Sequence, residues 1–106
     1  METDTRAVIA DITETLSVDP RVVPGTGFGA GHGLRVDGRI FVIFMPDVLV
    51  LKLPASRVGE LIAQTGATPF DAGKGKPMRE WVRVSAARRA EWAELAQEAL
   101  RFVARG

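Results

Sequence analysis

The apolar positions near the N-terminus have the spacing of a helix. Over residues 4–17 they recur at intervals of three and four, which places them on one side of a helix. Asp19-Pro20 ends this helix, because the residue before a proline avoids the helical region of backbone conformation. A glycine-rich loop is expected from there to Gly33.

The middle of the chain has the pattern of a strand meander. Two apolar segments, 34–36 and 39–45, flank Asp37-Gly38, a dipeptide that favours a two-residue type I′ hairpin turn. A second turn at Pro46-Asp47 leads into the apolar segment 48–53. We therefore predict three consecutive antiparallel strands.

The second half of the chain adds helices on either side of further strands. A helix is predicted from Ser56 to Gly66, strands over 68–70 and 78–84, and a long final helix after Ser85. The predicted order is α-β-β-β-α-β-β-α, within a single domain covering residues 1–106. Strand runs bracketed by helices favour an α+β fold in two layers, an antiparallel sheet with helices packed on it.

The predicted register creates a second apolar sheet face. A two-residue turn at Asp37-Gly38 pairs Leu34 with Phe41, and an even loop at Pro46-Asp47 places Ile43 beside Val50. Leu34, Phe41, Ile43 and Val50 would then share one face, opposite the face expected to carry the helices. We predict that this face is not left bare to water. The long C-terminal helix, a second subunit or another partner could cover it.

Composition indicates an ordinary globular protein without thiol chemistry. The 106 residues are 46% hydrophobic and 25% charged, and none is cysteine, which excludes disulfides and thiolate sites. The N-terminus is acidic where a signal peptide would be basic. The longest apolar run, 40–45, is far shorter than the ~20 residues of a membrane span. We expect a cytoplasmic protein with no membrane partner.

Residues that could support catalysis are sparse. His32 is the single histidine, and the acidic residues are scattered without a metal-ligand or paired-carboxylate pattern. The glycine run at 25–33 precedes strand-like residues rather than a helix, so it does not fit a dinucleotide site. We predict no catalytic residue, no metal, no cofactor and no enzymatic activity.

Positive charge is concentrated near the C-terminal third. Between Gly73 and Arg89 the basic residues are Lys74, Lys76, Arg79, Arg83, Arg88 and Arg89, with Glu80 as the acidic one. Arg79, Trp81 and Arg83 alternate along a predicted strand, so an indole lies between two guanidinium groups. Lys74, Lys76, Arg79, Trp81 and Arg83 are therefore the candidate residues for binding an anion or a partner. The alternative interpretation is a tryptophan covered by the stems of its own arginines.

Three segments resemble a known family. FGAGHGLRVDGRIF (28–41), LVLKLP (49–54) and KGKPM (74–78) are similar to the N-terminal domain of TfoX/Sxy-type bacterial proteins, and more distantly to MmcQ/YjbR-type domains. The resemblance implies a secretion-chaperone-like α+β fold and a bacterial regulatory role without catalytic residues. Full-length relatives carry a second, C-terminal domain, whereas this sequence ends at Gly106.

Two functional hypotheses follow. The first is a small regulatory domain that acts through protein–protein contact, with itself as a homodimer or with a different protein. The alternative is a nucleic-acid-binding module that uses the basic segment 74–89, with weak and salt-dependent affinity.

Overall fold

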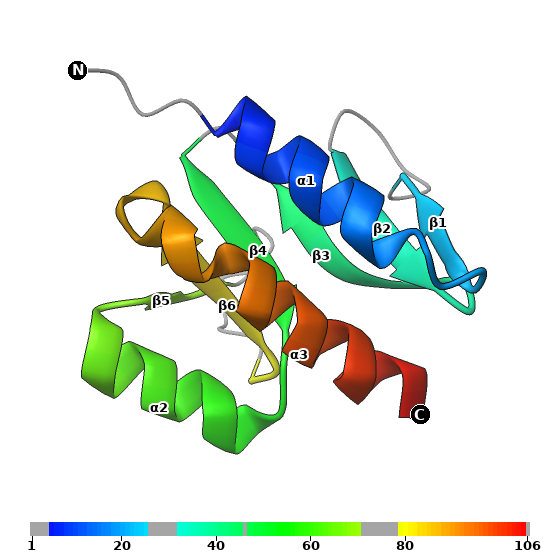
Figure 1. Ribbon diagram of the computed structural model, residues 1–106. Coiled ribbons are helices and arrows are strands. Elements are labelled where there is room, and N and C mark those ends of the chain that lie inside the picture. Colours follow the sequence, from blue (N-terminus) through cyan, green and yellow to red (C-terminus); the bar gives the residue numbers. More distant parts are fainter. Residues whose placement is uncertain (1–4, 26–31, 46, 71–78, 106) are drawn as a thin grey trace.

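The chain folds into one antiparallel sheet with helices packed on it, an α+β fold as the sequence predicts (Figure 1). The computed structural model describes residues 5–25, 32–45, 47–70 and 79–105. The helices in these residues are α1 (Arg6–Leu16), α2 (Ala55–Thr65) and α3 (Trp92–Arg105), and a 3-10 segment, η1 (Ala86–Glu91), leads into α3. The strands are β1 (Val22–Pro24), β2 (His32–Val36), β3 (Arg39–Phe44), β4 (Val48–Lys52), β5 (Thr68–Pro69) and β6 (Trp81–Ser85).

The predicted order lacked one strand. β1 follows α1 directly and pairs with β2, so the first strand lies where the sequence predicted a loop. Its three residues end at Pro24, which cannot donate a backbone hydrogen bond, and such a segment shows no strand pattern by itself. Pairing with β2 is what makes it a strand at the sheet edge, in the order β1-β2-β3-β4-β6-β5.

Local turn and cap chemistry agrees with the sequence at three of four positions. Asp37 and Gly38 both have positive φ, 53° and 81°, as a type I′ turn requires. Gly66 ends α2 in the left-handed conformation, and the Ser85 hydroxyl accepts a hydrogen bond from the Ala87 amide at 3.1 Å. The predicted helix start at Ser56 was wrong, because α2 already begins at Ala55 after Pro54.

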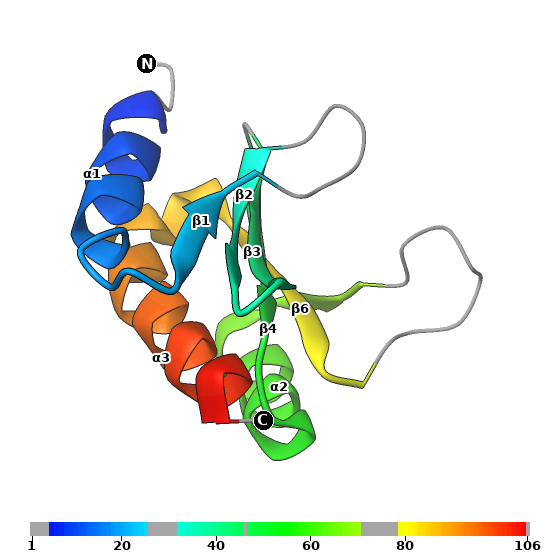
Figure 2. The same cartoon turned by 90° about the vertical axis from the view of Figure 1, so that its right-hand side faces the viewer.

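One face of the sheet carries the helices. Figure 2 shows α1 and α3 on the same side of β1–β4, while α2 packs beside β5 and β6. Leu34, Val42, Leu51 and Val82 pair directly across β2, β3, β4 and β6, and all four are fully buried. We call this the helix face. Burial of each such side chain stabilises the fold by roughly 1.5–3 kcal/mol.

The opposite row is formed by Ile43, Val50, Arg83 and Thr68, which also pair directly across neighbouring strands. No helix in the described residues lies on this side of the sheet, and we call it the helix-free face (Figure 2). Its centre is apolar and its margin is polar, since Val50 is fully buried while Arg83 and Thr68 are exposed.

A β-bulge separates the four residues predicted to share one face. Val36 pairs with Arg39 as expected, but the register shifts between Leu34 and Arg35, so that Leu34 lies opposite Val42 and not Phe41. Leu34 and Phe41 therefore belong to the core under the helices, and Ile43 and Val50 lie on the helix-free face. The prediction of a common face was wrong because an extra residue in β3 reverses the alternation on one side of the bulge.

Candidate functional site

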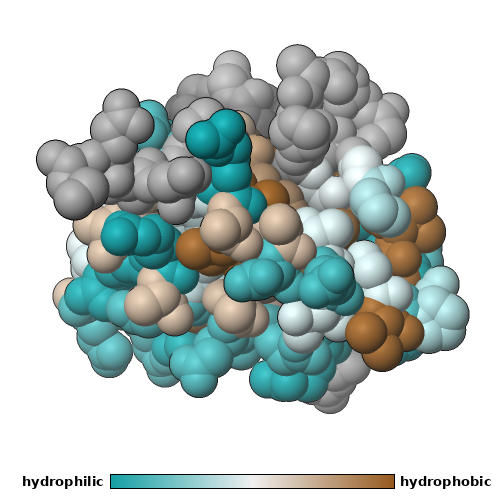
Figure 3. All heavy atoms as spheres, turned by 45° about the horizontal axis from the view of Figure 1, so that its top comes forward, coloured by the Kyte–Doolittle hydropathy of each residue, from teal (hydrophilic) through white to brown (hydrophobic). Residues whose placement is uncertain are grey.

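The predicted apolar interface is buried inside the chain. Leu34, Phe41 and Val50 have no exposed surface, and Ile43 is 9% exposed. Large hydrophobic side chains that are exposed lie on separate elements: Val18 after α1, Val23 in β1, Met45 after β3 and Ile62 in α2. Figure 3 likewise shows hydrophobic residues in small groups among hydrophilic ones. These four buried side chains thus offer no apolar patch to a second subunit.

Alternation along β6 brings Trp81 and Arg83 to the helix-free face. Val82 and Val84 are buried in the core, so Trp81 and Arg83, which alternate with them, point to the other side of the sheet. Trp81 is half-buried and Arg83 is exposed. Arg79 is exposed in the turn just before β6 and lines the same surface hollow as Trp81. The sequence predicts all three residues on one strand over 78–84, whereas the observed strand begins at Trp81 and leaves Arg79 in the turn before it.

Lys52 completes the surroundings of the indole. It lies directly opposite Trp81 in the pairing of β4 with β6, and its Nζ is 5.9 Å from the centre of the Trp81 ring. This distance is within the range of a cation–π contact. We call Lys52, Arg79, Trp81 and Arg83 the basic strip.

Phe70 supports the indole from a second direction. Its ring centre is 6.2 Å from that of Trp81, with the two ring planes at 52°. Tilted aromatic pairs at this separation attract each other and restrict each other's rotation. Trp81 is therefore held between Phe70 and Lys52 while part of its surface remains accessible to solvent.

Two shallow hollows lie at the two ends of the strip. One, about 410 Å³, is lined by Lys52, Ala55, Arg79, Glu80 and Trp81. The other, about 400 Å³, is lined by Met45, Asp47, Val48, Gly66, Thr68, Arg83 and Ser85. The first hollow thus combines two cationic side chains with one carboxylate, and the second combines one cationic side chain with one carboxylate and two hydroxyls. Both have the size of a ligand fragment, such as a phosphate with part of a sugar.

Among the residues that the structure describes, the cations of the strip have no carboxylate partners. Within the described ranges, ion pairs join Arg21 to Asp19, Arg57 to Glu60 and Glu98, and Arg88 to Glu91. Lys52, Arg79 and Arg83 take part in none of them. An incoming anion can therefore reach these charges without breaking an ion pair within the described part of the chain.

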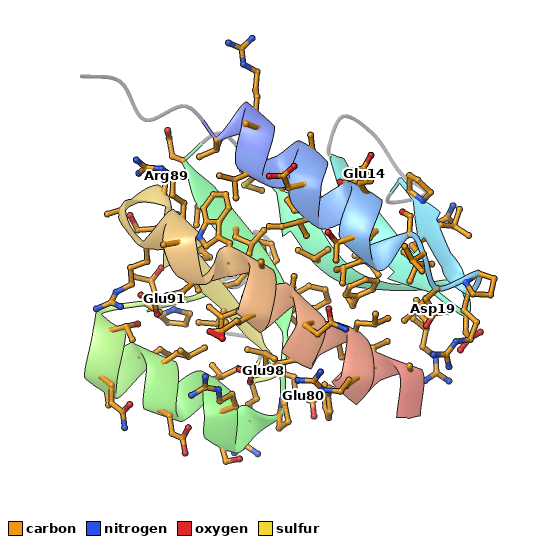
Figure 4. The ribbon with its side chains drawn as sticks, viewed as in Figure 1. Glu14, Asp19, Glu80, Arg89, Glu91 and Glu98 are labelled. Carbon is orange, nitrogen blue, oxygen red and sulfur yellow. The ribbon has the colours of Figure 1, made fainter. Side chains whose placement is uncertain are left out.

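The ion pairs elsewhere are reflected in pKa shifts. Hydrogen bonds from the Arg21 side chain and backbone lower the pKa of Asp19 from 3.8 to about 2. The hydrogen bond to Glu98 raises the pKa of Arg57. Figure 4 shows Glu98 on α3 where that helix passes α2, so this pair joins two helices and has no part in the strip.

The described part of the basic segment, residues 79–89, does not form a single surface. Arg88 pairs with Glu91, and Arg89 donates to the Ala86 carbonyl at 3.2 Å and lines a hollow with α1. Figure 4 shows Arg89 and Glu91 near one end of β6 and Glu80 at the other. Lys74 and Lys76 lie outside the described residues. Of the five candidate residues, the structure therefore brings together Arg79, Trp81 and Arg83.

Sequence reasoning missed two members of the site. Lys52 and Phe70 are 29 and 11 residues from Trp81 in the chain (81 − 52 and 81 − 70). They reach it only through the pairing of β4 and β5 with β6. The one local signal was a lysine at the end of an otherwise apolar strand, where a core-facing position would be apolar.

In residues 5–25, 32–45, 47–70 and 79–105, no group of three or more His, Cys, Asp or Glu residues could hold a metal ion. His32 begins β2, two residues before the apolar segment 34–36. In the same ranges, each helix is too short or too polar to cross a bilayer.

Comparisons with protein-family models, with curated proteins and with solved structures found no match to this chain. The resemblance to the TfoX N-terminal domain stays a prediction, and the site must be interpreted from its own geometry.

Proposed function

We propose that this chain is a small, non-catalytic module that binds nucleic acid through the basic strip. The observation that carries the proposal is the arrangement around Trp81: Lys52, Arg79 and Arg83 lack carboxylate partners in the described residues and border a half-exposed indole. Cations that contact phosphates beside an aromatic ring that contacts bases are the usual combination in nucleic-acid-binding grooves.

The affinity is expected to be modest and strongly dependent on salt. The net charge of the chain is +1, so no large positive field draws in a polyanion from a distance. Three phosphate contacts would lower log K with log salt at a slope of about −2 on a single strand. The carboxylates of Asp47 and Glu80 at the ends of the strip limit how far a polyanion can extend.

The other function predicted from the sequence is protein–protein contact. Its main supporting argument no longer applies. That argument required an apolar sheet face in need of cover, and the four residues concerned are buried within this chain. The regulatory role implied by the family resemblance is compatible with either kind of partner.

The test is fluorescence anisotropy with labelled oligonucleotides, single-stranded and duplex, over a series of salt concentrations. The double variant Arg79→Glu/Arg83→Glu should abolish measurable binding, because it replaces two phosphate contacts with two repulsions. Arg101→Glu with Arg39→Glu is the matched control, since both arginines are exposed and carry the same charges outside the strip. Equal weakening by the two double variants would mean that net charge, and not the strip, determines binding, and would refute the proposal.

A further inference from the structure

We infer that the strip takes single-stranded nucleic acid, with one unpaired base stacked on the Trp81 indole and Lys52 paired with an adjacent phosphate. This inference rests on the function proposed above and specifies its ligand. It excludes duplexes as the preferred partner, because the flat faces of paired bases are hidden inside the stack.

The first observation concerns the contact of the Trp81 indole with Lys52 and its exposure to solvent. The Lys52 ammonium lies 5.9 Å from the ring centre, so the electron-rich surface of the ring is already in contact with a solvated cation. Trp81 retains exposed surface, whereas Trp92, the other tryptophan, has none. A base can take the position of the ammonium over the ring, since every base has a flat π surface and needs no specific hydrogen bonds to stack.

The reach of Lys52 is the second observation. Its side chain has a flexible four-carbon stem, so the ammonium can leave the ring and still remain beside it. A nucleotide stacked on the indole brings its own phosphate to the same place. The lysine then exchanges a contact with the ring for a charge-assisted contact with a phosphate oxygen. Phe70 keeps the indole in position during this exchange, because it follows β5 on the other side of β6 from Lys52 and its tilted contact with the ring does not depend on the lysine.

The spacing along β6 is the third observation. Side chains on one face of a strand repeat every two residues, about 6.8 Å. A single strand whose base is stacked on Trp81 can therefore bring a neighbouring phosphate near Arg83. Thr68, directly opposite Arg83, adds an exposed hydroxyl as a further donor.

The experiment compares three probes of equal length, roughly 12 nucleotides, which spans a typical binding site of this kind. The probes are a single strand, the corresponding duplex and an abasic strand with the same phosphates but no bases. Binding is followed by anisotropy and by the intrinsic fluorescence of the protein. The single strand should bind at least about 10-fold more tightly than the other two and should quench Trp81. Trp92 serves as an internal reference, because a buried indole is not reached by a base.

Variants separate stacking from charge. Trp81→Leu should weaken single-strand binding about 5- to 100-fold and leave abasic-strand binding unchanged. Trp81→Phe should recover most of this loss, and near-ultraviolet circular dichroism of Trp92 should verify that both variants fold. Lys52→Met should weaken both strands and lower the salt slope by about 0.7.

The outcomes distinguish this inference from the proposed function. If duplex and abasic strand bind as tightly as the single strand, and Trp81→Leu changes nothing, stacking is refuted while nucleic-acid binding stands. If none of the probes binds at low salt, the proposed function fails and the inference with it. Binding of an acidic peptide in place of all three probes would likewise overturn both.

Discussion

The two faces of the sheet use alternate residues of the same strands, yet they differ in composition. The row across the helix face, formed by Leu34, Val42, Leu51 and Val82, is aliphatic and fully buried. The row across the helix-free face passes from Ile43 and Val50 to Arg83 and Thr68, and it becomes polar toward β5.

The helix face contributes mainly to stability, whereas the helix-free face near β6 carries the groups of the candidate site. Side chains on the helix face lie against α1 and α3, so a change there alters packing throughout the core. Near β6 the helix-free face holds exposed or half-exposed groups, and these can change their contacts when a ligand arrives. The two tryptophans show the contrast within one chain, one in the core and one at the surface.

The strongest test of the comparison uses two cross-strand neighbours on the helix-free face. Val50→Asp should destabilise the fold by about 4 kcal/mol or more, because it replaces an apolar side chain with a carboxylate that loses its hydration at a fully buried position. Arg83→Asp, directly opposite, should change the free energy of unfolding by about 0.5 kcal/mol or less, since Arg83 is exposed. Urea denaturation measures both. Similar values for the two variants would show that the centre of this face is not a buried layer.

A second test compares the tryptophans. Trp92→Ala should cost about 3–5 kcal/mol, because it removes a fully buried indole whose Nε1 donates to the Ser85 carbonyl at 3.2 Å. Trp81→Ala should cost about 1–2 kcal/mol, from the contacts with Phe70 and Lys52. Thermal and urea unfolding should rank the two variants in this order, and the reverse order would contradict the division between core and surface.

A third test measures how much the ion pair between α2 and α3 contributes to the free energy of unfolding. The Arg57 guanidinium donates to both Glu98 carboxylate oxygens, at 2.9 and 3.1 Å, with each side chain about one-third exposed. A double-mutant cycle of Arg57→Ala and Glu98→Ala should give a coupling of about 0.5–1 kcal/mol that decreases with added salt. A coupling of several kcal/mol would mean that this pair, and not the apolar core, holds α2 in place.

The smallest expected effect concerns Asp19 and its dependence on pH. Its folded-state pKa, about 2, lies below the ordinary 3.8, so its pair with Arg21 stabilises the fold above pH 3.8. That contribution decreases as the pH falls and is lost near pH 2. Asp19→Asn should therefore lower the melting temperature slightly at pH 7, and the difference from the unaltered protein should vanish near pH 2. A difference that persists at pH 2 would indicate a role for the side chain besides its charge.

Much of the local structure could be predicted from short stretches of sequence. The Asp37-Gly38 turn, the left-handed Gly66 and the Ser85 cap each depend on residues within a few positions, because backbone preference and capping are local effects. The α+β class also followed from sequence alone, since the spacing of apolar residues distinguishes strands from helices. For the site, alternation along β6 was enough to place Trp81 and Arg83 together.

Tertiary structure decided the rest. β1 exists because β2 offers it an edge, and the bulge near Phe41 moves Leu34 and Phe41 under the helices, away from Ile43 and Val50. Lys52 and Phe70 meet Trp81 only because β6 inserts between β4 and β5. These features depend on which strands become neighbours and on where one extra residue is accommodated. Neither is encoded in local pattern, because both are settled by the packing of the whole sheet against its helices.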